Sequence, residues 1–378
     1  MLLTYILAFF TVISLVLTVW QWLVASSFPL EQRAANPSFS PAISILKPLK
    51  GFDSRTAECL RSWCEQDYAG SVQILFGVES AEDPVCGLVR EIVGAFPQLD
   101  AQLVVCPEKH GANAKVSTLI QLQRLAKHEV MLVSDADVHA PRDLLREVVQ
   151  PLIDSSAGLV TCFYRLTNKS NLGMRWEAFA INADFWSQVL QAQSLKPIDF
   201  AMGAVMVTRK AELERIGAFA SLADFLADDY QLGNKIARAG RRVVLSPVVV
   251  ECRSATLQWK DVWTHQKRWA RTIRISQPIP YFFSKLSNAT FWPLLWVVCD
   301  PGPRSYLFGA FCLAVRMGQA CYCEGKLTGR MRLSSLWMAP LKDTLQLAIW
   351  MLAFAGNRIR WRGREFAVQP SGKLVPLP

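Results

Sequence analysis

The sequence is poor in charge: Asp, Glu, Lys and Arg make up 19% of its 378 residues, below the roughly 25% of soluble domains. It has four His, and none of its ten Cys belongs to a Cys-x-x-Cys pair. The usual signatures of structural zinc and of a disulfide framework are therefore missing, and we expect reduced thiols. Hydrophobic residues reach 51%, which indicates that part of the chain lies in lipid.

The first apolar stretch, Leu2 to Ala25, contains no charged side chain. About 20 such residues, at 1.5 Å each, cross the core of a bilayer. We therefore predict a transmembrane anchor over 1–26 and a polar linker over 27–42. A cleaved signal peptide is the alternative, but it would carry basic residues ahead of a shorter apolar stretch.

Three weaker apolar stretches lie near the C-terminus, because Arg316 interrupts the second and Lys342 and Asp343 interrupt the third. These stretches are Phe291–Cys299, Tyr306–Cys323 and Leu336–Ala355. We expect membrane or interfacial helices over 276–356 and a basic cytosolic tail over 357–378.

The net charge of +10 gathers beside these apolar segments. Basic residues that flank membrane helices favour the cytoplasmic face. We therefore expect a multi-pass membrane protein whose main domain is cytosolic. No DNA- or RNA-recognition motif accompanies the charge, so we expect no nucleic-acid partner. The basic residues in question are Lys267, Arg268, Arg271, Arg274, Arg358, Arg360, Arg362 and Arg364.

Between the ends, short apolar runs alternate with stretches of helical spacing. This alternation predicts an α/β domain over 43–275 with a mainly parallel central sheet, whose ligands bind at the carboxyl ends of the strands. The expected strands are Ile43–Leu46, Val72–Val78, Ala101–Val105, Val130–Ser134, Gly158–Phe163, Ala204–Val207 and Val243–Leu245. The expected helices are Thr56–Glu65, Val85–Phe96, Ser117–Lys127 and Arg142–Ile153.

Two carboxylates, Asp135 and Asp137, leave the end of the apolar run Val130–Ser134. On an extended chain, side chains two residues apart face the same way, so both could bind one Mg²⁺ or Mn²⁺ ion. That ion would neutralise a diphosphate and act as a Lewis acid. A solvated pair of loop aspartates is the alternative.

Two loops offer further contacts for a nucleotide. Asp83 follows the run Val72–Val78 and could bind a base or ribose, although Asp before Pro is also a common helix start. Lys115 ends a basic, glycine-containing loop that begins at Lys109 and could pair with phosphate. A solvated turn is the alternative for this second loop.

Asp228 and Asp229 begin a predicted helix that runs to about Gly240. Acidic residues at a helix start stabilise its dipole. Alternatively one of them, for which we favour Asp229, takes a proton from an acceptor hydroxyl as general base. Asp228 would then line the acceptor pocket.

A basic aromatic run, His265 to Arg271, precedes the C-terminal apolar segments. Arg268 could hold a diphosphate in a bidentate contact, and Trp269 could wall an acceptor pocket. A juxtamembrane anchor for anionic headgroups is the alternative.

Taken in order, these motifs resemble family-2-type inverting glycosyltransferases of the GT-A fold, and most nearly the ceramide glucosyltransferase group. The resemblance covers nearly the whole chain and includes the strand motif Leu46–Gly51. Two stretches, Gly158–Arg165 and Leu226–Tyr230, are similar to bacterial hopanoid-associated glycosyltransferases, which implies the bacterial inner membrane. Animal ceramide enzymes carry Gly at the position of Asp137, and the family has Gln or Arg at that of His265.

The resemblance implies a UDP-sugar donor, a lipid acceptor (a ceramide or a hopanoid polyol), and Mg²⁺ or Mn²⁺ at Asp135 and Asp137. It implies inversion in one displacement with Asp229 as base. Lys47 joins the expected donor-binding residues, and His265 the acceptor pocket. Two rival interpretations are a processive polysaccharide synthase, for which three weak C-terminal segments look too few to form a channel, and a noncatalytic membrane lipid binder.

Overall fold

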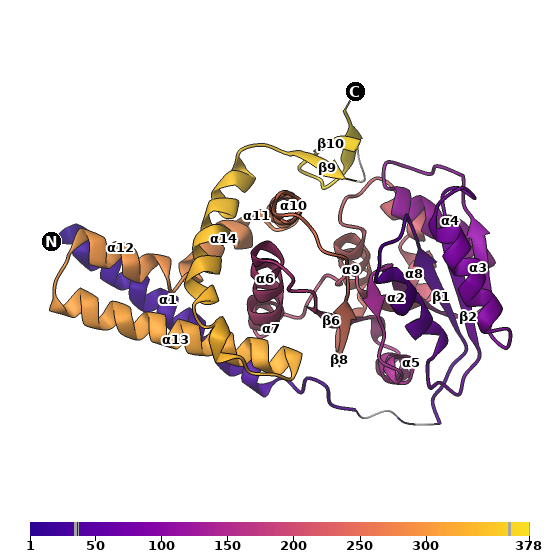
Figure 1. Cartoon of the computed structure of the whole chain (residues 1–378), viewed down its shortest axis with the longest axis horizontal. Helices are drawn as coiled ribbons and strands as arrows, with labels where there is room; N and C mark the ends of the chain where they lie inside the picture. The colour runs from indigo at the N-terminus through magenta and orange to yellow at the C-terminus, as the bar shows by residue number, and fades with distance from the viewer. Residues whose placement is uncertain (34–35, 37, 362–363, 378) are drawn as a thin grey trace. The chain divides into compact units, whose positions relative to one another are not determined.

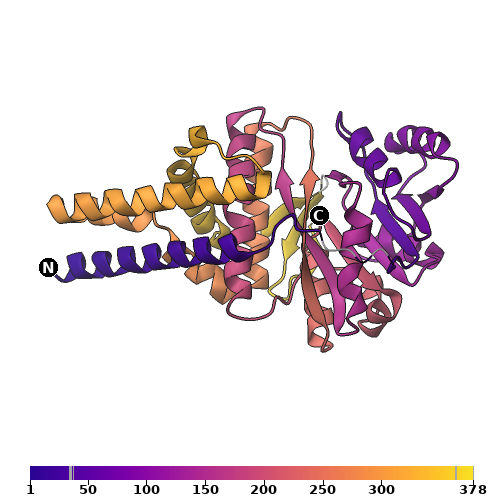
Figure 2. The same cartoon turned by 90° about the horizontal axis from the view of Figure 1, so that it is seen from below.

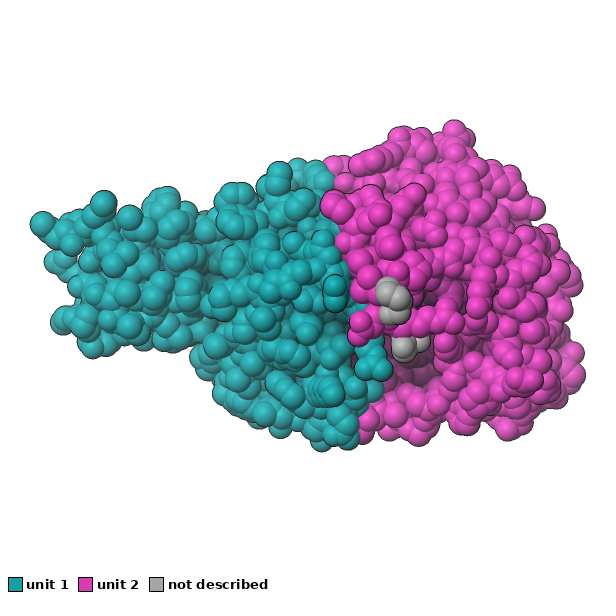
Figure 3. Space-filling model, turned by 90° about the horizontal axis from the view of Figure 1, so that it is seen from above, with its two compact units in different colours: residues 1–28, 169–196, 257–360 teal, residues 29–168, 197–256, 361–378 magenta. Residues whose placement is uncertain are grey.

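The computed structural model describes residues 1–33, 36, 38–361 and 364–377. The chain divides into two compact units, coloured separately in Figure 3. Unit 1 comprises residues 1–28, 169–196 and 257–360, and unit 2 comprises residues 29–168, 197–256 and 361–378. Two stretches that the sequence analysis assigned to the 43–275 domain, 169–196 and 257–275, thus group with the terminal helices.

Unit 2 contains an eight-stranded sheet in the order β3-β2-β1-β4-β7-β6-β8-β5. Strands β1 to β4 run parallel, as do β6 and β8, whereas β7 and β5 are antiparallel to their neighbours. The strands are β1 Ile43–Pro48, β2 Val72–Val78, β3 Asp100–Val105, β4 Val130–Ser134, β5 Val138–His139, β6 Ala157–Leu166, β7 Val205–Arg209 and β8 Arg242–Cys252. The predicted α/β fold with a mainly parallel sheet is confirmed.

Helices of unit 2 connect the strands along the chain (Figure 1). Their amphipathic spacing follows from one apolar stripe: α3, for example, buries Val85, Val89 and Ile92 and leaves its other face to solvent. The helices are α2 Thr56–Cys64, α3 Val85–Ala95, α4 Ala114–Leu125, α5 Leu144–Val148, α8 Lys210–Arg215 and α9 Asp228–Arg238. Strand β4 is buried along its whole length, which agrees with its unbroken apolar run.

Unit 1 is helical. Its elements are α1 Leu2–Ser27, α6 Leu172–Phe179, the π-helical turn Ala180–Phe185, α7 Trp186–Gln193, α10 Trp259–Ser276, α11 Pro278–Phe283, α12 Phe291–Cys299, α13 Pro303–Thr328 and α14 Met338–Phe354. Helices α1 and α13 run side by side (Figures 1 and 2), and the Lys326 ammonium donates to the Ala25 carbonyl at 2.9 Å.

Helix α1 buries polar side chains and exposes apolar ones. Thr11, Ser14 and Thr18 are at most 2% exposed, whereas Phe9 and Leu23 are 61% and 63% exposed. A helix surrounded by water shows the opposite arrangement. Within the described ranges, α1 is the one helix with the length and apolarity to cross a membrane.

The charged residues that interrupt the C-terminal apolar stretches are buried and paired. Arg316 lies 2.7 Å from Asp184 and 2.8 Å from Asp343, and Lys342 contacts both carboxylates. Helix α12 has 9 residues, so by itself it is shorter than a bilayer core. The membrane placement of 276–356 stays a prediction.

The described part of the predicted basic tail, residues 357–378, contains short strands. Strand β9, Arg358–Trp361, follows α14, and β10, Arg364–Val368, pairs antiparallel with β11, Leu374–Pro376, within unit 2. The ten cysteines all lie in the described part of the chain and are free thiols.

Candidate active site

The carboxyl ends of two parallel strands in unit 2 lead into predicted acidic residues. Asp135 follows β4 directly, and Asp83 follows β2 after a short loop. Because both strands run parallel to β1, their ends lie at the same edge of the sheet. Ligands of such sheets bind at this edge.

The acids after β4 do not continue as an extended strand. Ala136 and Asp137 form a turn, closed by a 3.4 Å hydrogen bond from the Val138 amide to the Asp135 carbonyl. The alternation of an extended chain therefore does not explain how Asp135 and Asp137 are oriented. Asp137 is exposed and the Asp135 side chain is 41% exposed, so both carboxylates remain accessible to a ligand.

Lys115, at the start of α4, bridges two of the predicted site residues. Its ammonium lies 2.8 Å from Asp135 and 3.0 Å from Asp228. Burial lowers the pKa of Lys115, but the carboxylates of Asp135, Asp228 and Asp229 outweigh burial and raise it. The lysine therefore stays charged and brings the strand β4 motif and the helix α9 motif together.

Gly203 separates two carboxylates that come from different elements. A methyl group at this position would lie 3.1 Å from Asp229 Oδ2 and 3.3 Å from Asp135 Oδ2. The two oxygens are therefore no farther apart than the sum of these distances. A side chain at position 203 would therefore be in tight contact with both carboxylates, which would have to shift by a few tenths of an ångström.

Asp229 has the electrostatics of a base near neutral pH. Burial raises its pKa to about 6, with a further contribution from the negative charge of Asp228 and an opposing one from Lys115. Its Oδ1 accepts a 2.7 Å hydrogen bond from the Tyr230 amide. The carboxylate is thus held in place and is mostly ionised at pH 7.

Lys47, on β1, contacts the end of β4. It is fully buried, and its ammonium donates to the Ser134 hydroxyl at 3.2 Å and to the Asp135 carbonyl at 2.5 Å, 4.6 Å from the centre of the Trp63 ring. Burial lowers the pKa of Lys47 to about 8, although Asp135 and Asp137 oppose the change. Its contacts support the end of β4.

Asp83 accepts hydrogen bonds from the Gly51 amide at 3.0 Å and from the Val85 amide at 3.0 Å. It ties the loop after β1 to the start of α3. The residue also lines a cavity of about 410 Å³ with Lys50, Glu79, Ser80, Glu82 and Pro107. Asp83 thus binds the amide at the start of α3 and borders this cavity, and its contact with a base or ribose stays a prediction.

His265, Arg268 and Trp269 lie on α10, in unit 1. The His265 ring nitrogen Nδ1 is 2.6 Å from the buried Glu177 carboxylate, and its ring centre is 5.1 Å from that of Trp269. The centre of the Phe185 ring lies 6.0 Å from that of Trp269. His265, Trp269, Glu177 and Phe185 therefore form a polar and aromatic cluster within unit 1.

Sequence reasoning assigned no role to Asn113. This fully buried residue caps α4 through the Val116 amide, and its Nδ2 donates to the Phe225 carbonyl at 2.8 Å and to Asp228 at 3.4 Å. An Asn before a helix is a recognisable cap. Its contact with the acidic loop has no signal in the sequence.

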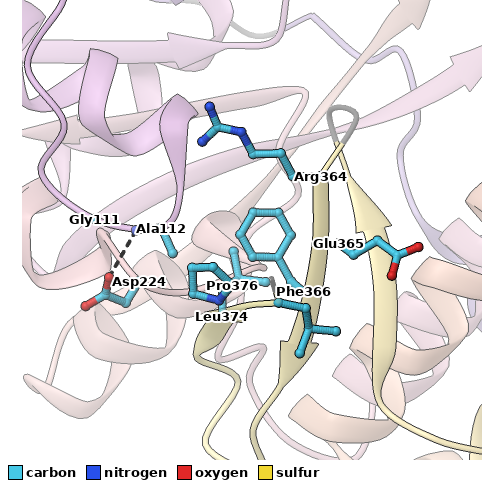
Figure 4. A pocket seen from close by; sticks show the side chains of 9 residues that line it. Gly111, Ala112, Asp224, Arg364, Glu365, Phe366, Leu374 and Pro376 are labelled. Carbon is cyan, nitrogen blue, oxygen red and sulfur yellow. Dashed lines mark hydrogen bonds between the residues drawn. The ribbon is translucent and has the colours of Figure 1, made fainter.

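A second cavity, of about 500 Å³, lies within unit 2 (Figure 4). It is lined by residues of the C-terminal strands and by the loops that contain Ala112 and Asp224. The Asp224 carboxylate accepts a hydrogen bond from the Ala112 amide at 3.1 Å. Arg364 and Phe366 enter from β10, and Leu374 and Pro376 from β11. The tail therefore lies beside the loop that leads into Asp228.

With regard to a metal, the described residues contain no group of three or more His, Cys, Asp or Glu side chains placed to hold an ion. The two accessible carboxylates after β4 supply hard oxygen atoms. Mg²⁺ characteristically takes only one or two carboxylates and completes its shell with water and substrate phosphates. The donor set therefore fits such an ion.

Comparison with known proteins gives consistent matches. Residues 3–374 match glycosyl transferase family 21. Ceramide glucosyltransferase 3 of Caenorhabditis elegans is 21% identical over 93% of this chain and 78% of its own length, and ceramide glucosyltransferase 1 of the same organism is 22% identical over 62% of this chain and half of its own length. A solved mannosyltransferase from Pyrobaculum calidifontis, in complex with GDP-Man and Mn²⁺, aligns with a TM-score of 0.55 at 19% identity over 91% of this chain and 99% of its own.

The structural likeness supports the GT-A fold, and the family match extends over both units rather than over unit 2 alone. Lys115 contacts Asp135 after β4 and Asp228 at the start of α9. The fold and the family match both indicate a glycosyltransferase. The chain belongs to glycosyl transferase family 21 and is a glycosyltransferase of the ceramide glucosyltransferase type.

Proposed function

We propose that the chain transfers a hexose or N-acetylhexosamine from a UDP-sugar to the hydroxyl of a membrane lipid, a ceramide or a hopanoid polyol, with inversion at the anomeric carbon. The observation that carries the proposal is the meeting of Asp135, Asp228 and Asp229 around Lys115 and Gly203 at the sheet edge. The ceramide glucosyltransferases among the relatives support the lipid acceptor.

Asp229 acts as the general base in this proposal. A base works best when its pKa lies near the working pH, and burial places that of Asp229 at about 6. It takes the proton of the acceptor hydroxyl while the acceptor oxygen forms a bond to the anomeric carbon. The bond from that carbon to the diphosphate oxygen breaks in the same step.

Asp135 and Asp137 hold Mg²⁺ or Mn²⁺ in the proposed complex. The bound ion would neutralise charge on the diphosphate. The Pyrobaculum mannosyltransferase, which shares the fold, was solved with Mn²⁺ and GDP-Man, and this supports a divalent ion here. Lys47 supports the end of β4 from below, so we assign it a positioning role in donor binding.

The remaining roles follow the resemblance. Asp83 contacts the uracil or ribose from the rim of its cavity, Lys115 adds positive charge near the phosphates, and Arg268 binds the diphosphate. Asp228, His265 and Trp269 border the acceptor. The proposal also includes the membrane anchor and the C-terminal membrane helices. It places the protein in the bacterial inner membrane, with the catalytic domain on the cytosolic side.

The test is sugar transfer by the purified full-length chain in lipid nanodiscs. UDP-glucose, UDP-galactose and UDP-N-acetylglucosamine are each supplied with Mn²⁺ and with ceramide or a hopanoid polyol, and lipid products are read by mass spectrometry. We expect a glycolipid from at least one combination and the β-anomer from an α-linked donor. Failure of every donor to yield either glycolipid or free UDP would favour a noncatalytic lipid binder.

A further inference from the structure

The loop that leads into the acidic pair, residues 223–227, is held from two directions. On one side, the start of α4 binds it: the Asn113 amide donates to the Ala223 carbonyl at 2.8 Å, and the Asn113 side chain donates to the Phe225 carbonyl at 2.8 Å. This side belongs to the sheet framework, because α4 follows β3 and precedes β4.

On the other side, the C-terminal residues bind the same loop through backbone atoms. The Leu374 amide donates to the Asp224 carbonyl at 2.7 Å, and the Leu226 amide donates to the Gly372 carbonyl at 3.2 Å. Phe225 and Lys373 face each other as an antiparallel bridge. The tail thus adds a short strand to the loop, a mode of association in which main-chain hydrogen bonds fix the register.

Side chains reinforce this contact. The Lys373 ammonium lies 5.8 Å from the centre of the Phe225 ring, and that of Lys235 lies 5.9 Å from it. Leu374 is buried, and Gly372 adopts a left-handed conformation with φ of +86°. A side chain at position 372 would therefore strain the turn and approach Gln231 at 3.4 Å.

We propose that residues 372–374 are a positioning segment of the active site, which holds loop 223–227 so that Asp228 meets Lys115 and Asp229 faces Gly203. The segment touches neither substrate nor ion. It acts because two residues separate Leu226 from Asp229, so a shift of this loop moves both carboxylates. The inference rests on the proposed function, in which Asp229 is the base.

Two variants test the proposal in the full-length chain. Leu374→Pro removes the amide that donates to Asp224, and Gly372→Ala strains the turn while keeping every backbone donor. Val375→Ala is the matched control, because Val375 is 39% exposed and its side chain takes no part in the loop contact described above. We expect both variants to lower kcat by about a hundredfold, the typical effect of a misplaced catalytic group, with the donor KM unchanged.

Hydrogen exchange of residues 224–231 provides a readout that does not depend on activity. We expect faster exchange there in Leu374→Pro and Gly372→Ala than in Val375→Ala, with the strands β1 and β4 unaffected. If Leu374→Pro does not fold, Gly372→Ala decides. Unchanged kcat and unchanged exchange in a folded variant would overturn the proposal, whereas an inactive wild-type chain with faster exchange in the variants would count against the proposed function alone.

Discussion

The ammonium of Lys115 lies 2.8 Å from Asp135 and 3.0 Å from Asp228, two carboxylates that are 93 positions apart in the sequence. Lys115 and Asp228 are nearly buried, with side chains that are each 10% exposed. Removing one partner of a buried ion pair leaves uncompensated charge, which costs about 3 to 5 kcal/mol. Lys115 therefore stabilises the arrangement of Asp135 and Asp228.

Lys115→Met should lower the free energy of unfolding by several kcal/mol and abolish measurable transfer, because two carboxylates lose their counter-charge. Chemical denaturation and steady-state kinetics measure the two effects. Lys127→Met is the control, since its salt bridge to Asp100 is exposed and such pairs contribute about 0 to 1 kcal/mol. Equal loss of stability in both variants would contradict the bridging role.

Asp229→Asn should keep donor binding and reduce kcat by roughly 10² to 10⁴, the usual contribution of a general base. In the unmodified chain, kcat/KM should rise with pH through about 6, where the carboxylate ionises, and then level off. The pH profile and calorimetric donor binding are the measurements. Undiminished turnover in the Asn variant would remove Asp229 as base.

The same substitution should stabilise the fold at neutral pH. The pKa of Asp229 is raised from its ordinary 3.8 to about 6, so the folded state binds the proton more tightly than the unfolded state. Its contribution to stability is therefore present below pH 4 and is lost as pH rises through 6. We expect Asp229→Asn to have a higher Tm than the wild type at pH 7.5 and no advantage at pH 4. Equal Tm differences at both pH values would count against the raised pKa.

Gly203→Ala should reduce activity strongly, by about 10² or more, because the added methyl group would approach the Asp229 and Asp135 oxygens at 3.1 and 3.3 Å. Gly87→Ala is the matched control: it lies in α3 with open space around its Cβ position, where Ala is also the better helix former. Full activity of Gly203→Ala would show that this approach is not required.

Metal use can be tested at Asp135 and Asp137 separately. Replacement of either by Asn should raise the Mn²⁺ concentration needed for half-maximal donor binding by about tenfold or more, since each removes one anionic ligand. Titration of Mn²⁺ against donor binding measures the shift. Asp67→Asn is the control, because Asp67 is an exposed carboxylate, and it should leave the titration unchanged. If Asp137→Asn also left the titration unchanged, Asp137 would be excluded as a ligand.

Much of unit 2 could be predicted from the sequence because its strands contain short apolar runs that alternate with stretches of helical spacing. Val130–Ser134 has the bounds of β4 as predicted, and the acids that follow had to lie at a strand end. The orientation of Asp137 could not be predicted, since a two-residue turn replaces the expected extended backbone.

The rest of the site depends on contacts between distant segments. Nothing in the sequence around Gly203 indicates that two carboxylates approach it, and nothing in Gly372–Leu374 indicates a partner near Asp224. Nothing in the sequence around Arg316 indicates that it pairs with Asp184 and Asp343. Local composition does not contain this information, because each pairing is decided by tertiary packing.

Helix α1 is hydrogen-bonded to another helix of unit 1. Gln21 donates to the Ser187 hydroxyl at 2.6 Å, and Gln191 donates to the Leu17 carbonyl at 2.9 Å. These bonds join α1 to α7, and the bond from Lys326 joins α1 to α13. A shortened chain that begins after Ser27 would leave Ser187 and Gln191 without these hydrogen-bond partners and would uncover the neighbouring helices. Attempts to obtain a soluble enzyme by trimming the first helix should therefore yield an aggregating protein.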